Sequence, residues 1–409
     1  MKTPYRSLLG ITCGIVAGLL LPLSDPLTQA LTLVVEFVYR IGRYVALPLI
    51  FFSLPIAVTK MRRQGKLASL LGHGALITIL TSAFFALIGV GAAWLLNAVR
   101  VPVVPGAAQA PSVPTLSNLF RAMLPENGFE VFQTQASFLL PLVIPAFLLG
   151  WHFHHDKEIA EPAYNVFDSL SRIIYRINQY ILQLMPLFIA ILTTKLVVDV
   201  RGIVDLVRFL PMLGILGGIT AVLILGIYPI ALYFAGGRQT PWGALAGLIG
   251  TLFSAVLSGA PLFNYGSLVR HLKENLRIPR HSAALLTPLS LMFTRAGTAL
   301  VTGFAMMTVI QSYSSLEITL FQAGWCALFS FLISFALPST LFGGISAALV
   351  LLGGLYGRGL DDGWLIMAPV LPFLAMFAVL LDTATTAFVV LLATRKSQCG
   401  SDDLPRLNF

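Results

Sequence analysis

Long apolar runs separated by short polar connectors make up most of the chain. Largely apolar runs cover about 7–23, 31–59, 67–98, 165–197 and 206–236. Each is long enough to cross a membrane as a helix, which takes about 17–25 residues. A further run, TLSNLFRAMLPENGFEVFQTQASFLLPLVIPAFLLG, carries three prolines, so we expect a broken helix there. The pattern predicts an all-α polytopic membrane protein.

After residue 240 the pattern changes. Residues 242–270 are apolar but interrupted by SGAPLFNYGS, and residues 320–357 are interrupted by LPSTLFGGIS. Irregular backbone at membrane depth is tolerated only where it is buried in protein or lines a cavity. Such interruptions also kink ordinary spans, but here each leads into a long helix, at about 282–311 and 363–394. The repetition favours two re-entrant hairpins related as inverted repeats, as in transporters.

Each of these two long helices contains one deeply placed charged residue. Arg295 lies in SLMFTRAGTAL and Asp382 in VLLDTATTAF. An ionisable side chain in the apolar part of a membrane costs roughly several kcal/mol. Such residues persist when they face a cavity, pair with each other or bind a ligand. Both are therefore candidate functional residues.

Composition and charge agree with a membrane protein. The chain is 57% hydrophobic and 11% charged, far below the roughly 25% charged residues of a soluble domain. The net charge of +9 comes from basic clusters in short connectors. Placing all of these in the cytoplasm gives an alternating topology with both termini inside. We therefore expect a multi-pass protein of a bacterial-type inner (plasma) membrane, and no nucleic-acid partner.

The remaining residue types exclude other classes. The N-terminal apolar run has no small-residue cleavage site after it and is read as the first helix. The three cysteines are scattered without metal-ligand spacing. No nucleophile–base motif indicates an enzyme, and we expect no cofactor and no metal. Asp168 and Arg172 are four residues apart and are expected to pair on one helix face in a structural role.

Several stretches, in their order and spacing, resemble a known family. They cover nearly the whole chain: YVALPLIFFSLPIAV, ILTSAFFALIGV, MLPENGFEVF, IIYRINQYILQLMPLFI and RIPRHSAALLTPLSLMFTRAGTAL. The chain resembles the dicarboxylate/amino acid:cation symporter family, which includes glutamate and neutral amino acid transporters. The resemblance implies eight transmembrane helices, two re-entrant helical hairpins, a homotrimer surrounded by membrane lipid, and an elevator mechanism.

The resemblance also implies a division of the chain. Residues 1–66 and 99–200 would form a rigid scaffold, with an external loop at VPVVPGAAQAPSVP in the second of these segments. Residues 67–98 and 201–397 would form a transport domain that slides against the scaffold. Residues 398–409 would be a cytoplasmic tail.

The resemblance assigns substrate-binding roles to individual residues of this chain. The resemblance implies that Asp382 holds the ammonium group of the substrate and that the hydroxyls of Thr298 and Thr386 lie near it. Thr385 stands where members with acidic substrates carry an arginine, and members with a small residue there favour neutral amino acids. Arg295 is a further candidate. The hairpins supply further candidates in Ser258, Asn264, Ser267, Ser339 and Thr340.

The cation-binding positions of the family are largely lost. Its carboxylates fall on Ala296 and Ala393, and its asparagines on Thr294 and Val389, whereas Thr81 and Ser82 match retained ligands. Hard cations prefer charged oxygen ligands, so sodium would bind poorly. We hypothesise that Arg295 is a tethered substitute for the bound cations. The alternative is that Arg295 only pairs with a carbonyl or with Asp382. Sodium sites made of main-chain carbonyls alone leave no trace in a sequence.

Charge balance bears on the substrate. Asp382 and Arg295 together give a site of zero net charge, which suits a zwitterion. If Arg295 instead points into the substrate pocket, it would bind a carboxylate through two parallel hydrogen bonds. We favour a sodium-independent transporter of small neutral amino acids. The alternatives are a proton- or sodium-coupled symporter of acidic amino acids or dicarboxylates, and a sensor or anion channel that has lost transport.

Overall fold

The computed structural model describes residues 3–22, 24–96, 121, 138–153, 157–203, 206–234, 241–313, 318–337, 343–357, 360 and 363–397. Within these ranges every regular element is a helix and there is no strand. In the described residues, six helical segments are long and apolar enough to cross a membrane, and some of them consist of several consecutive elements. The number is seven if α7 and α8 form one bent span, and shorter apolar helices accompany these segments. The expected external loop and cytoplasmic tail lie outside the described residues.

The first half of the described chain contains six helices. They are α1 (Thr3–Leu20), α2 (Asp25–Arg63), α3 (Leu67–Leu95), α6 (Leu140–His152), α7 (Lys157–Gln183) and α8 (Met185–Gly202). The expectation of one continuous helix over 165–197 was wrong. The chain bends by 54° between α7 and α8, since Pro186 has no N–H to continue the helical hydrogen bonds.

The second half contains the two interrupted regions. A span of successive helices comes first: η1 (Leu206–Phe209), α9 (Leu210–Val222), the π-helix η2 (Leu223–Ile227) and α10 (Tyr228–Phe234). The first hairpin consists of α11 (Pro241–Ser258), η3 (Leu262–Asn264) and α12 (Tyr265–Glu274). It is followed by α13 (Arg280–Phe293) and α14 (Ala296–Tyr313), and then by α15 (Leu320–Ser334), α16 (Gly343–Tyr356), η4 (Gly363–Val370) and α17 (Leu371–Lys396).

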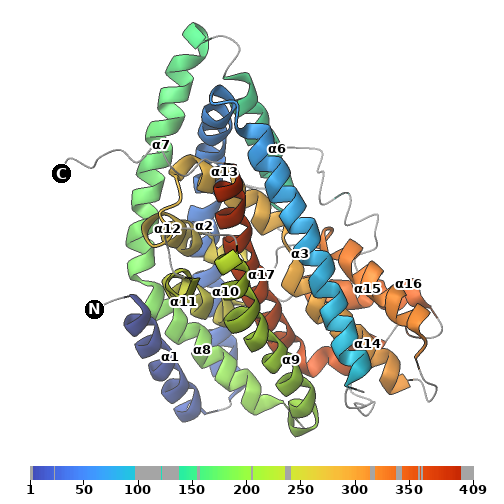
Figure 1. Ribbon diagram of the computed structural model, residues 1–409. Coiled ribbons are helices and arrows are strands. Elements are labelled where there is room, and N and C mark those ends of the chain that lie inside the picture. Colours follow the sequence, from blue (N-terminus) through green and yellow to red (C-terminus); the bar gives the residue numbers. More distant parts are fainter. Residues whose placement is uncertain are drawn as a thin grey trace.

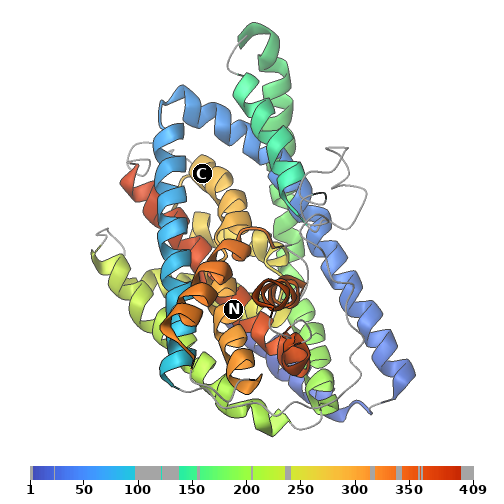
Figure 2. The ribbon, with the colours of Figure 1, turned by 90° about the vertical axis from the view of Figure 1, so that its right-hand side faces the viewer.

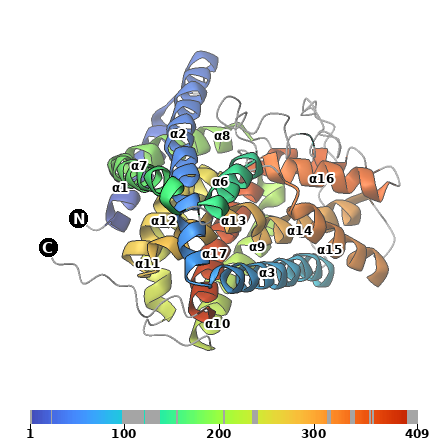
Figure 3. The ribbon, with the colours of Figure 1, turned by 90° about the horizontal axis from the view of Figure 1, so that it is seen from above.

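The helices pack in two groups. In one, α1 lies along α8, and α2 lies along α6 and α7; in the other, α3, α14, α15 and α17 pack together. α17 runs through the middle of the bundle, with α1 and α7 on one side and α15 and α16 on the other (Figures 1 and 3). The joined ends of α6 and α7 project beyond the other helices (Figure 2). α13 connects the groups, because it packs on both α2 and α17.

Small residues allow a close contact between α1 and α8. Gly10, Gly14 and Gly18 are four residues apart on one face of α1. A Cβ atom at Gly10 would lie 2.4 Å from the carbonyl oxygen of Pro186, and one at Gly14 would lie 2.5 Å from that of Ala190. Such spacing of small residues lets membrane helices approach backbone to backbone.

One local prediction is confirmed. Arg172 Nε lies 2.9 Å from Asp168 Oδ2 on α7, because residues four apart share a helix face. Asp168 Oδ1 also forms an ion pair with Arg280 Nη1 of α13, at 3.3 Å. This second contact attaches the connecting helix α13 to α7.

Candidate functional site

The helix that was expected to hold Arg295 is broken at that residue. The helix expected over 282–311 is present as one membrane-long segment, Arg280–Tyr313, but it is divided into α13 and α14. The N–H of Thr294 bonds to the carbonyl of Ser290 at 2.6 Å and ends α13. The N–H of Arg295 then bonds to the carbonyl of Phe293 at 3.0 Å, with Thr294 at φ −83° and ψ 79°. This is an inverse γ-turn. It brings the C-terminus of α13 and the N-terminus of α14 together inside the protein.

Asp382, in the middle of α17, caps the N-terminus of α14. Its Oδ1 accepts the backbone N–H of Thr298 at 3.0 Å, and its Oδ2 accepts the Thr298 hydroxyl at 2.6 Å. A carboxylate is stabilised at a helix N-terminus by the unpaired N–H groups and the helix dipole. The close approach requires Gly297, since a Cβ atom there would lie 2.4 Å from the carbonyl oxygen of Ala378.

Arg295 completes a buried charged group with Asp382. Its Nη1 lies 4.0 Å from Asp382 Oδ2, and the two side chains are 3% and 4% exposed. The negative charge of Asp382 is thus balanced by a guanidinium, by two donors of Thr298 and by the end of α14. The site has no net charge, and its carboxylate is already engaged. A role of Asp382 toward an ammonium group stays a prediction.

The residual cation positions lie beside this break. The hydroxyl of Thr294 is 2.8 Å from that of Thr78 on α3. The hydroxyl of Thr81 bonds to the carbonyl of Ile77 in its own helix at 2.7 Å. The hydroxyl of Ser82 is buried and has no hydrogen-bond partner among the described residues. Thr78 was missed by the sequence analysis, since a single threonine in an apolar helix carries no distinguishing signal.

Thr385 is bonded to a residue that the sequence analysis also missed. Its hydroxyl lies 2.5 Å from the phenol oxygen of Tyr228 and donates to the carbonyl of Leu381 at 2.6 Å. The ring of Tyr228 packs against Phe388, with centroids 5.2 Å apart. The one available signal was a phenol hydroxyl inside an apolar run, where such a group needs a partner. The neighbouring Thr386 hydroxyl is buried without a hydrogen-bond partner in the described part of the chain.

The polar candidates of the first hairpin hold its tip together. Gly259, at φ 56°, ends α11 in the left-handed conformation that favours glycine. The amide of Asn264 donates to the hydroxyl of Ser258 at 2.9 Å, and its oxygen accepts from Ser254 at 2.5 Å. The phenol of Tyr39 on α2 donates to the carbonyl of Ser258. These bonds close the turn and attach it to α2.

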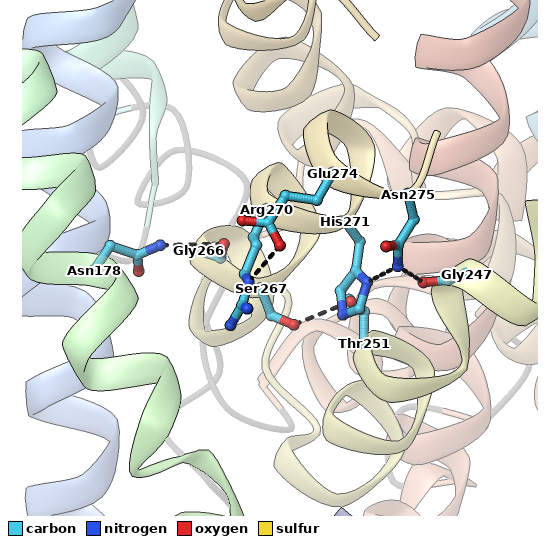
Figure 4. Close-up of polar contacts among 9 residues, drawn as sticks. All are labelled: Asn178, Gly247, Thr251, Gly266, Ser267, Arg270, His271, Glu274 and Asn275. Carbon is cyan, nitrogen blue, oxygen red and sulfur yellow. Dashed lines mark hydrogen bonds and ion pairs between the residues drawn. The ribbon is translucent and has the colours of Figure 1, made fainter. Parts of the chain in front are cut away.

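The arms of the first hairpin are joined farther from the tip. The hydroxyls of Ser267 and Thr251 are 3.0 Å apart, and Asn275 donates to the carbonyl of Gly247 at 2.7 Å (Figure 4). Asn178 on α7 donates to the carbonyl of Gly266 at 3.2 Å (Figure 4). The hydrogen bonds of Ser267 and its neighbours therefore hold the two arms of the hairpin together. Ser339 and Thr340, the candidates from the second expected hairpin, lie outside the described residues.

A comparison with known proteins decides the family. The model of the sodium:dicarboxylate symporter family matches residues 4–395. The chain belongs to this family. Membership of this family and the helices long enough to span a membrane together make the chain a multi-pass membrane protein.

Two curated relatives match parts of the chain at low identity. The chain is 25% identical to the excitatory amino acid transporter 1 of Ambystoma tigrinum over 53% of its own length and 38% of that protein. It is 25% identical to the excitatory amino acid transporter 1 of Mus musculus over 48% of its length and 36% of that protein. The matched region thus covers well under half of the length of each of these relatives.

Proposed function

We propose that this protein is a secondary transporter that moves an amino acid across the membrane without sodium coupling, with Arg295 in place of the bound cations. The observation that carries the proposal is the Arg295 guanidinium, buried at a helix break and 4.0 Å from Asp382. It puts a permanent positive charge beside positions where the family resemblance expects cation ligands.

Electrostatics support the loss of sodium coupling. The helices α13, α14 and α17 contain one carboxylate, Asp382, and it is engaged by Arg295 and Thr298. A second cation about 4 Å from the guanidinium would be repelled by about 4 kcal/mol at an effective dielectric constant of 20. The hydroxyls of Thr81 and Ser82 are neutral and would offset little of this cost.

The surroundings of Thr385 support a small neutral substrate. Its hydroxyl is held by Tyr228, and Phe388 packs on that ring. An arginine at position 385 would supply a charge for an acidic side chain, but threonine supplies none. A zwitterionic amino acid keeps the neutral balance of Arg295 and Asp382.

A second candidate is a proton- or sodium-coupled symporter of acidic amino acids or dicarboxylates. The names of the family and of the excitatory amino acid transporters favour it. In that case Arg295 would leave Asp382 and bind the carboxylate of the substrate. Asp382 would be the group available to carry a proton.

The proposal includes an elevator motion in a homotrimer, with both termini in the cytoplasm. The scaffold would comprise α1, α2, α6, α7 and α8, and the transport domain α3 and α9 to α17. The two packing groups support this division, because α1 and α8, and α2 with α6 and α7, lie along each other. The basic ends of the helices support the orientation.

Uptake into proteoliposomes tests the proposal. Vesicles loaded with unlabelled substrate would receive a panel of labelled amino acids and dicarboxylates, in choline buffer with or without sodium. We expect exchange of a small neutral amino acid at the same rate in both buffers. The variant Arg295→Met should lose exchange, whereas Arg176→Met, an exposed site on α7, should keep it.

Other outcomes select the alternatives. Uptake that requires sodium would contradict the role of Arg295 as a substitute cation. Uptake of a dicarboxylate with internal acidification that disappears in Asp382→Asn would favour the proton-coupled symporter. Anion currents without uptake of any compound in the panel would favour a channel.

A further inference from the structure

A basic pocket lies where the end of α2 and the middle of α7 meet the start of α13. Its volume is about 350 Å³, within the range of about 300–1,000 Å³ that is usual for small-molecule sites. Two helices of the first packing group, α2 and α7, and the connecting helix α13 contribute to it. The lining residues are Lys60, Arg63, Gln64, Tyr164, Asp168, Arg172 and His281.

The positive charge in this basic pocket exceeds the negative charge. Among the described residues of the lining, Asp168 is the one carboxylate, and it is shared between two guanidiniums. Arg172 Nε lies 2.9 Å from one of its oxygens, and Arg280 Nη1 lies 3.3 Å from the other. Lys60 and Arg63 make no ion pair with any acid of the described chain. The lining therefore keeps a surplus of two positive charges, before Arg280 and His281 are counted.

Two of the basic side chains at the pocket are held in place by neighbours. The guanidinium of Arg63 lies over the ring of Tyr164, 5.4 Å from its centroid. Arg280 Nη2 donates to the hydroxyl of Ser171 at 2.6 Å. Side chains that are already ordered lose less conformational freedom when they bind a ligand. Guanidinium and ammonium groups are the side chains that bind phosphate oxygens best, the former through two parallel bonds.

From the end of the apolar run of α2 we infer that the pocket lies near the level of the lipid headgroups. It lies at the end of α2, where the apolar run gives way to Lys60, Arg62 and Arg63. Clusters of basic residues next to a membrane span attract anionic lipids. We propose that the basic pocket binds the phosphate group of an anionic ligand, with the headgroup of an anionic membrane lipid as the source that its position favours. The occupant would contact α2, α7 and α13 together and hold α13 against the other two.

Binding to the purified full chain in detergent tests the proposal independently of transport. Native mass spectrometry would be used to titrate three probes: dioctanoyl phosphatidylglycerol, dioctanoyl phosphatidylcholine and glycerol 3-phosphate. Each basic residue near an anionic surface contributes about a fivefold gain in binding. We therefore expect the variant Lys60→Gln/Arg63→Gln to bind phosphatidylglycerol about 25-fold more weakly.

Matched variants make the result specific to the pocket. Arg208→Gln/Lys396→Gln removes the same charge from two exposed sites outside the lining and should bind as the parent protein does. The charge-retaining variant Lys60→Arg/Arg63→Lys should keep most of the binding. If it does, the weaker binding of Lys60→Gln/Arg63→Gln results from the lost charge and not from misfolding. Glycerol 3-phosphate binding with the same dependence on the variants, without lipid binding, would support the phosphate site and assign it a soluble ligand.

Two outcomes would overturn the proposal. One is that neither phosphate probe binds more tightly than phosphatidylcholine. The other is that both double Gln variants weaken binding equally, which would mean that the lipid responds to overall charge.

Discussion

Replacing Arg295 by methionine is expected to destabilise the protein measurably. The charged atoms of Arg295 and Asp382 are 4.0 Å apart, and both side chains are at least 96% buried. The attraction at that distance is about 4 kcal/mol at an effective dielectric constant of 20. Removing one partner of a buried pair costs about 3–5 kcal/mol. Because the Thr298 donors and the end of α14 remain beside Asp382, we expect a loss near 3 kcal/mol in the free energy of unfolding.

A double-mutant cycle separates this interaction from other effects. Asp382→Asn keeps the shape of the side chain and leaves Arg295 without its counter-charge. The variant Arg295→Met/Asp382→Asn removes both charges and should lose less than the sum of the single losses, with a coupling of about 2–3 kcal/mol. Unfolding would be followed by circular dichroism during titration of detergent micelles with dodecyl sulfate. Arg176→Met is the control, expected to change stability by less than about 0.5 kcal/mol.

Additive losses would refute the reasoning. If the double variant loses the sum of the single losses within about 0.5 kcal/mol, the two charges do not interact in the folded protein. Arg295 would then not be positioned by Asp382, and its assignment as a substitute cation would lose its structural basis.

Three further variants test the packing of the site by the same unfolding titration. Thr298→Val removes the hydroxyl bonded to Asp382 at 2.6 Å and should cost about 1.5–3 kcal/mol, as for hydrogen bonds to charged groups, while Thr298→Ser should cost less. Gly297→Ala places a methyl group 2.4 Å from a carbonyl oxygen and should cost about 1–3 kcal/mol or more, whereas Gly324→Ala, which meets open space, should be neutral or stabilising by up to about 1 kcal/mol; equal effects would contradict the close approach of α14 and α17. Tyr228→Phe removes one buried hydrogen bond and should cost about 1 kcal/mol, and no loss would mean that this bond contributes nothing to stability.

The amino-acid sequence alone was enough to predict the class of the protein. The length and spacing of the apolar runs predicted a helical membrane protein, since a chain in lipid must satisfy its backbone hydrogen bonds within helices. The ion pair of Asp168 and Arg172 was predicted because it depends on helix geometry alone. Arg295 and Asp382 stood out because charge is costly at membrane depth. All of these follow from local chemistry.

The tertiary structure decided how those residues are used. Neither residue at the break, Thr294 or Arg295, is a proline or a glycine, and the apolar run therefore predicts one helix. The structure divides this helix at the point where Asp382 of α17 caps α14. The bond between Tyr228 and Thr385 joins residues 157 positions apart. The basic pocket likewise assembles side chains from three helices. Contacts between distant segments depend on how whole helices pack, and local pattern does not encode that packing.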